Sequence, residues 1–202
     1  MTIRELKKFL RDHPPKNGIS VADLADFQFR ILLLDNLNNE MDGISSRMLT
    51  PERLAEGKEA EKRIAAITTP EEILREMRKS HTLSNLASLA KKALQMQDEV
   101  MPLILDTYRK TRHTIFTENA SKLLANADTK YTEELVGCYK DIWHPYAQSL
   151  ACLLFGYHGF MDTIPLLLSE YDRFKRLYPD ETYDQCPLKA LGYLVDKAES
   201  EQ

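Results

Sequence analysis

The sequence predicts an all-α protein whose C-terminal half is a series of helical hairpin repeats. Three observations predict this fold class. Glycine is scarce, at seven residues, and the nine prolines lie mostly where helices are expected to begin or end. No segment alternates apolar and polar residues over a strand length. After residue 97, apolar positions with helical spacing recur about every 31–32 residues.

The N-terminal half contains clear helix-start signals. Thr50-Pro51-Glu52 and Thr69-Pro70-Glu71-Glu72 each place an N-cap threonine before a first-turn proline and acidic residues. Ser20 with Asp23 is a shorter version of the same start. The asparagine-rich segment 36–49 is expected to be a loop. Helices are expected near residues 2–12, 20–35, 51–66, 70–78 and 82–96.

The C-terminal half contains most of the aromatic residues. All nine tyrosines and the single tryptophan follow residue 107. Because aromatic side chains provide the largest apolar area per residue, the better-packed core is expected here. Further helices are expected near residues 99–111, 114–126, 131–141, 145–157, 162–178 and 187–199.

Three helical stripes that end in tyrosine define the repeat. Each has side chains at positions i, i+3, i+4 and i+7, which share one face of a helix. Eleven of these twelve side chains are apolar or aromatic. The stripes are Met101, Ile104, Leu105 and Tyr108; Thr132, Leu135, Val136 and Tyr139; and Ile164, Leu167, Leu168 and Tyr171.

The second helix of each hairpin also repeats. Ala120-Ser121-Lys122-Leu123-Leu124 returns one period later as Ala151-Cys152-Leu153-Leu154-Phe155, and Ala190-Leu191-Gly192-Tyr193-Leu194 is a looser third copy. Single hairpins cannot bury their apolar stripe, whereas stacked neighbours can. The pattern resembles HEAT-type repeats, although its period is shorter, and a tetratricopeptide-style arrangement is the alternative. The resemblance covers about residues 98–199.

This resemblance implies an α-α superhelix for the C-terminal half, and the whole chain is expected to have two regions. Residues 1–97 are expected to form an N-terminal helical region that packs on the repeats. Residues 98–199 are expected to form three HEAT-like hairpins, and the two regions together one continuous structural unit. A surface of stacked hairpins implies a protein-binding scaffold.

Composition and charge indicate where the protein is located and which classes of partner it is expected to bind. The formal net charge of −4 disfavours general binding to nucleic acid. Three cysteines without a CxxC pair indicate reduced thiols and a cytoplasmic protein. The charged first residues do not form a signal peptide, and the longest apolar run, 150–157, is too short to span a bilayer. No membrane association is expected.

One candidate binding patch is aromatic. Trp143, His144 and Tyr146 lie in the expected turn of the second hairpin, and His158 lies just past its second helix. Tryptophan and tyrosine are frequent anchors of protein interfaces. The alternative is that Trp143 and Tyr146 close the end of the hairpin, while Gly159 caps the helix beside His158.

A second candidate patch is basic. Its residues lie in two clusters, each at the end of a first-position helix, and a solenoid could place both clusters along one edge. The simpler interpretation is that these cations complement helix dipoles. The candidate side chains are Arg109, Lys110, Arg112, Arg173 and Lys175.

No catalytic, cofactor or metal-binding pattern is present. GxGxxG, P-loop, GxSxG and HExxH patterns are absent, and the five histidines have no ligand spacing. We therefore expect a non-enzymatic helical-repeat interaction module that binds a protein or peptide, without a cofactor or metal. The alternative is a nucleic-acid-associated HEAT-like protein, including a DNA-repair-type glycosylase. For such a glycosylase, Asp141 and Trp143, two positions apart, are the candidate acidic and aromatic pair.

Overall fold

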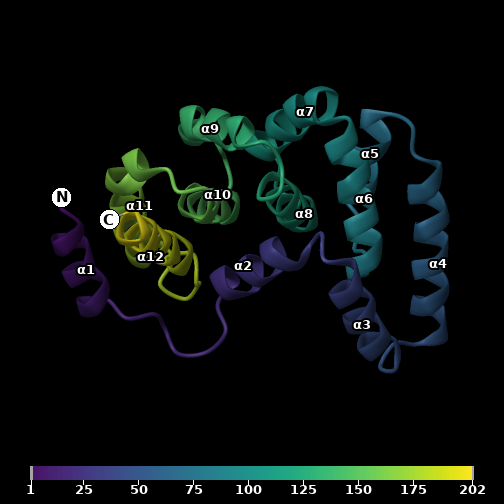
Figure 1. Cartoon of the computed structure of the whole chain (residues 1–202), viewed down its shortest axis with the longest axis horizontal. Coiled ribbons are helices and arrows are strands. Elements are labelled where there is room, and N and C mark those ends of the chain that lie inside the picture. Colours follow the sequence, from purple (N-terminus) through teal and green to yellow (C-terminus); the bar gives the residue numbers. More distant parts are fainter. Residues whose placement is uncertain (1, 202) are drawn as a thin grey trace. The chain divides into compact units, whose positions relative to one another are not determined.

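The chain is all-helical in the computed structural model, which describes residues 2–201 (Figure 1). That range contains twelve α-helices and two short 3-10 segments, and it contains no strand. None of these helices is long and apolar enough to span a membrane. The elements are α1 (Ile3–Asp12), α2 (Val21–Ile31), α3 (Asp35–Ser46), α4 (Pro51–Ala66), α5 (Pro70–Glu76), α6 (Leu83–Gln95), α7 (Gln97–Lys110), α8 (Thr114–Leu124), α9 (Thr129–Gly137), η1 (Tyr139–Asp141), α10 (Pro145–Tyr157), η2 (Met161–Thr163), α11 (Ile164–Leu177) and α12 (Gln185–Ser200).

The helices form two compact units. Unit 1 combines the described residues up to Asp26 with those from Asp128 onward, and unit 2 spans Phe27–Ala127. Residues 98–127 therefore belong to the same unit as residues 27–97. The α1 helix belongs to the same unit as the C-terminal helices.

Unit 2 is organised around α6, which contacts α3, α4, α5, α7 and α8. In Figure 1, α4 runs alongside α6. The apolar side of α6 is buried, including Leu86, Leu89 and Ala93. The predicted N-caps of unit 2 are confirmed, because Thr50 accepts the Arg53 amide and Thr69 forms a capping box with Glu72.

Unit 1 is organised around α12, which packs against α10, α11 and α1. The closest approach joins α10 to α12. A Cβ built on Gly156 would overlap the backbone of Ala190, so only glycine fits at this crossing. On the α1 side, the ring of Phe9 packs edge-to-face on Tyr171 with centroids 5.5 Å apart.

Two expectations about helix boundaries are wrong. The segment 36–49 is not a loop, because α3 occupies Asp35–Ser46. The helix expected at 131–141 stops at Gly137, and Tyr139 instead begins the 3-10 turn η1. Tyr139 is nevertheless buried, as are Tyr108 and Tyr171.

Candidate functional site

The turn before α10 exposes the only tryptophan. Trp143 lies between η1 and α10, and its side chain is 68% exposed. The residues on both sides are fixed. The Ile142 carbonyl accepts a hydrogen bond from Gln148 at 2.7 Å, and the His144 ring accepts the Tyr146 amide at 3.2 Å. Trp143 therefore does not close the end of the hairpin, but stands exposed on an anchored turn.

Tyr146 belongs to an aromatic cluster in unit 1. Its ring lies 5.9 Å from that of Tyr183, which in turn lies 5.6 Å from Tyr178 and 6.1 Å from Phe174. These separations are typical of favourable aromatic pairs. The cluster joins the first turn of α10 to the end of α11 and to the segment before α12.

Arg173 links this cluster to the turn that bears Trp143. Its guanidinium carbon lies 4.4 Å from the centroid of the Phe174 ring, and its Nη2 donates to Gln148 at 2.6 Å. Gln148 in turn holds the Ile142 carbonyl. One chain of contacts thus links Arg173 to Ile142, the residue before Trp143, and the aromatic cluster links it to Tyr146 and His144.

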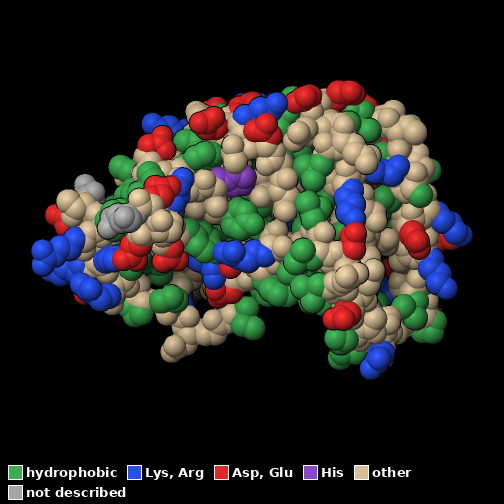
Figure 2. Space-filling view, in the orientation of Figure 1, with side chains coloured by type: hydrophobic (Ala, Val, Ile, Leu, Met, Phe, Trp, Pro, Cys, Tyr) green, Lys and Arg blue, Asp and Glu red, His purple; other side chains and the backbone are tan. Residues whose placement is uncertain are grey.

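The basic candidates are largely engaged by neighbouring side chains. Arg109 and Lys110 both bond to Asp106, at 2.9 and 2.7 Å. Arg173 pairs with Glu170, and Lys175 donates to the Tyr171 hydroxyl at 3.4 Å. Figure 2 shows basic and acidic side chains interspersed over the visible face.

The remaining basic and histidine candidates lie elsewhere. Arg112 is exposed and, with Arg109 and Lys110, belongs to unit 2, whereas Arg173 and Lys175 belong to unit 1. His158 lies at the far end of α10 from His144, a helix of 13 residues or about 20 Å. There it stacks on Phe160, beside the Gly159 cap. Gly159 has φ +76°, and the Phe160 amide reaches back to the Phe155 carbonyl, which confirms the predicted C-cap.

Two histidines at equivalent repeat positions have the same capping role. His113 accepts the Phe116 amide at 3.2 Å at the start of α8, and His144 accepts the Tyr146 amide at 3.2 Å at the start of α10. Their separation along the chain equals the period of the first two stripes. The spacing was visible in the sequence, but histidine is not among the favoured N-cap residues.

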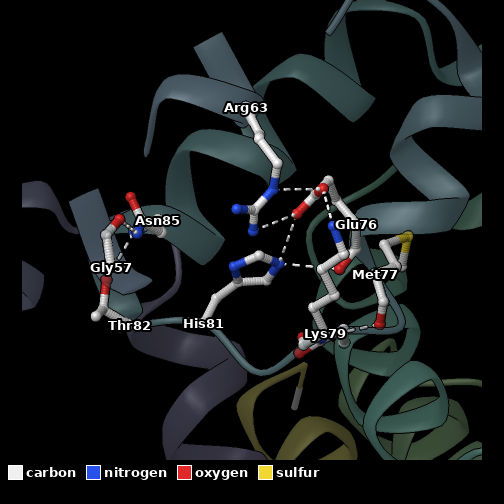
Figure 3. Close-up of polar contacts among 9 residues, drawn as sticks. Gly57, Arg63, Glu76, Met77, Lys79, His81, Thr82 and Asn85 are labelled. Carbon is white, nitrogen blue, oxygen red and sulfur yellow. Dashed lines mark hydrogen bonds and ion pairs between the residues drawn. The ribbon is translucent and has the colours of Figure 1, made fainter. Parts of the chain in front are cut away.

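A charge network around the buried Glu76 carboxylate in unit 2 was not predicted. Figure 3 shows the Glu76 carboxylate between Arg63 and Lys79, with the His81 ring below. Arg63 Nε donates to Glu76 at 3.1 Å, and His81 Nε2 donates to the Glu76 backbone carbonyl at 2.9 Å. The wall of a large open groove, with a volume of about 1010 Å³, includes Arg63, Lys79 and His81.

Burial governs the protonation of this network. Desolvation lowers the pKa of His81, whose side chain has no exposed surface, so the imidazole is neutral. Burial opposes the ionisation of Glu76. Hydrogen bonds from Lys79 and Arg63 outweigh that effect, and the pKa of Glu76 is lowered. The network therefore consists of a carboxylate, two cations and a neutral imidazole. Local sequence spacing gave no signal for it, because Arg63 and Glu76 lie on different helices.

The cysteines lie in positions suited to packing. Cys152 and Cys186 are fully buried, and none of the three cysteines forms a disulfide. Burial raises the pKa of the Cys186 thiol to about 12 and raises that of Cys152 further. Both thiols are therefore protonated and unreactive at neutral pH. Across residues 2–201, no group of three or more His, Cys, Asp or Glu side chains is arranged to hold a metal ion.

Comparison with known proteins gives no relative. No protein-family model matches the chain, and neither a curated protein nor a solved structure has significant similarity to it.

Proposed function

We propose that this protein is a non-enzymatic interaction module built of HEAT-like helical hairpins, which docks another protein on the surface around Trp143. The exposure of Trp143 is the observation that supports this most. Exposing a large indole to water forgoes the free energy gained by burying it, whereas the same side chain buried by a partner is a typical interface anchor.

The rigid surroundings of Trp143 also support a docking role. His144 caps α10, Pro145 occupies its first turn, and Arg173 holds Gln148 against the turn. An anchor on a fixed turn loses little conformational freedom on binding, so more of its contact energy is available as affinity.

The hairpin architecture is supported by a recurring contact. The Tyr108 hydroxyl lies 3.1 Å from Ser121 Oγ, and the Tyr139 hydroxyl lies 3.4 Å from Cys152 Sγ. The two contacts have the same spacing along the chain, and the second pair follows the first by one period of the stripes. This is what two successive copies of one hairpin would produce. The free thiols are consistent with the reducing cytoplasm.

The test compares exposed apolar residues in the two units. Wild-type protein, Trp143→Ala and Met48→Ala would each be used as bait in the source cell, followed by crosslinking and mass spectrometry with and without nuclease. Met48 is the matched control, because it is 87% exposed and lies in unit 2.

A protein partner that is retained by wild type and Met48→Ala, lost with Trp143→Ala and insensitive to nuclease is the expected result. Equal capture by Trp143→Ala would contradict docking at this surface. Loss of every partner on nuclease treatment would instead favour the nucleic-acid alternative.

A further inference from the structure

Unit 1 contains a cavity of small-molecule size. Its volume is about 320 Å³, and its walls come from α1, the segment between α1 and α2, the first turn of α2 and one face of α12. Small-molecule sites usually begin at about 300 Å³ and combine apolar walls with a few polar groups. The apolar part of this wall is formed by Leu10, Pro15, Ala22 and Leu188.

The floor of the cavity is a glycine without a packing role. Lys189, Gly192 and Asp196 are spaced i, i+3 and i+7 on α12, so they share one face with Gly192 in the middle. A Cβ built on Gly192 would meet no atom within 4 Å. Glycine weakens a helix interior relative to alanine. The close contact with Ala190 explains why residue 156 is a glycine. At residue 192 no such contact exists, and the effect of the glycine is to leave the cavity open.

The cavity is negatively charged. At one end, Lys189 bonds to Asp23 at 2.8 Å and also lies 3.6 Å from Asp26. Hydrogen bonds from Lys189 and Ser20 lower the pKa of Asp23 to about 2, which keeps it ionised. At the other end, about two helical turns along α12, Asp196 forms no ion pair within residues 2–201. A cation entering the cavity therefore meets a surplus of carboxylates.

We propose that this cavity binds a small organic amine, with its ammonium group toward Asp196 and its apolar body against Leu10 and Leu188. The rings of His13 and Tyr193 complete the wall. Aromatic faces of tyrosine attract organic cations, so the Tyr193 ring suits an ammonium compound better than an anion. An anion of the same size would be repelled by Asp196.

The experiment uses three probes of similar size and different charge. Phenethylamine is a cation at neutral pH, 2-phenylethanol is neutral and phenylacetate is an anion. Each would be titrated into the full chain while amide NMR shifts of residues 188–196 are followed. Saturable shifts with phenethylamine, several-fold weaker binding of the alcohol and no saturation with phenylacetate are expected. Equal affinity for the amine and the alcohol, or no saturation with the amine, would overturn the proposal.

Two variants locate the bound amine. Gly192→Leu fills the cavity from a position with free space, so the fold is kept and amine binding is lost. Asp196→Asn removes an exposed charge without changing shape, and the amine affinity should fall by about three- to fivefold. Asp172→Asn is the control, because Asp172 is an exposed carboxylate on α11, and it should leave the affinity unchanged. Undiminished binding in Gly192→Leu would place the amine elsewhere and contradict the proposed site.

Discussion

The hydroxyl of Tyr139 donates a hydrogen bond to Oε2 of Glu170 across 2.7 Å, and both side chains are buried. Glu170 also accepts from Arg173, so its charge is compensated although it lies inside the protein. This contact connects the turn after α9 to α11, two elements that are separated in sequence by the whole of α10. The tyrosines of the repeat therefore contribute polar contacts as well as apolar area.

Removal of the Tyr139 hydroxyl should destabilise unit 1. Tyr139→Phe leaves the buried Glu170 carboxylate without one of its donors, and the expected loss is about 1–3 kcal/mol. Tyr139→Ala also removes the ring and should cost about 3–5 kcal/mol. Urea unfolding measures both losses. Tyr178→Phe, at a half-exposed position, is the control and should change little. Wild-type stability in Tyr139→Phe would contradict the assigned contact.

The crossing of α10 and α12 predicts a glycine-specific effect. Gly156→Ala places a methyl group on the Ala190 backbone, and overpacking of this kind costs about 1–3 kcal/mol. Gly192→Ala lies on α12 but faces open space, so it should be neutral or slightly stabilising. Thermal melts of the two variants provide the comparison. A higher melting temperature for Gly156→Ala than for Gly192→Ala would show that the crossing is looser than described.

A substitution at Gly43 tests whether this part of the chain is the helix α3 or the loop that the sequence led us to expect. It lies inside α3, and a Cβ there would meet nothing within 4 Å. Gly43→Ala should therefore stabilise the protein by about 0.5–1 kcal/mol, because alanine favours an unstrained helix interior. Chemical denaturation measures the change. A loop at 36–49 would give no such gain.

The missed helix shows where local propensity is insufficient. Asparagine and glycine are poor helix formers, so residues 36–49 resemble a loop. In the structure, the polar side chains of this segment are used as hydrogen-bond partners. Asn38 donates to the nearby Leu32 carbonyl, and Asp42 accepts the Leu83 and Ser84 amides at the start of α6. The contacts of Asp42 join residues 41 and 42 positions apart, so they cannot be recognised from a local pattern.

Sequence patterns predicted the structure correctly where a residue forms its hydrogen bonds with residues only a few positions away. The threonine caps, the Gly159 cap and most helices follow from spacing within a few residues. The exposure of Trp143 did not follow, because it depends on how Arg173 and Gln148 hold the turn. The Glu76 network likewise depends on the meeting of α4 with α5.

The Glu76 network predicts a measurable shift at His81. Burial lowers the pKa of His81, the Glu76 charge raises it, and the Arg63 and Lys79 charges lower it. Its imidazole should titrate below about 6.5, the ordinary value. Because the folded pKa is lowered, the stabilising contribution is complete above about pH 6.5 and is lost as the pH falls through the folded value.

Replacing the Glu76 carboxylate tests the direction of its effect on the His81 pKa. Glu76→Gln removes the one charge that raises the His81 pKa, so the pKa should fall further while Arg63 and Lys79 remain. Proton NMR of the His81 imidazole in wild type and Glu76→Gln across pH 4–8 measures the shift. A rise in the His81 pKa in Glu76→Gln would contradict the contact between the Glu76 carboxylate and the ring.

The accessibility of Trp143 tests the proposed function most directly, since its fluorescence is the only indole signal of the chain. Acrylamide quenching should be strong for the protein alone, and it should fall when a nuclease-insensitive partner identified by the Trp143→Ala comparison is added. Strong quenching that is unchanged by that partner would mean that the indole remains in water in the complex, and it would contradict docking at this surface.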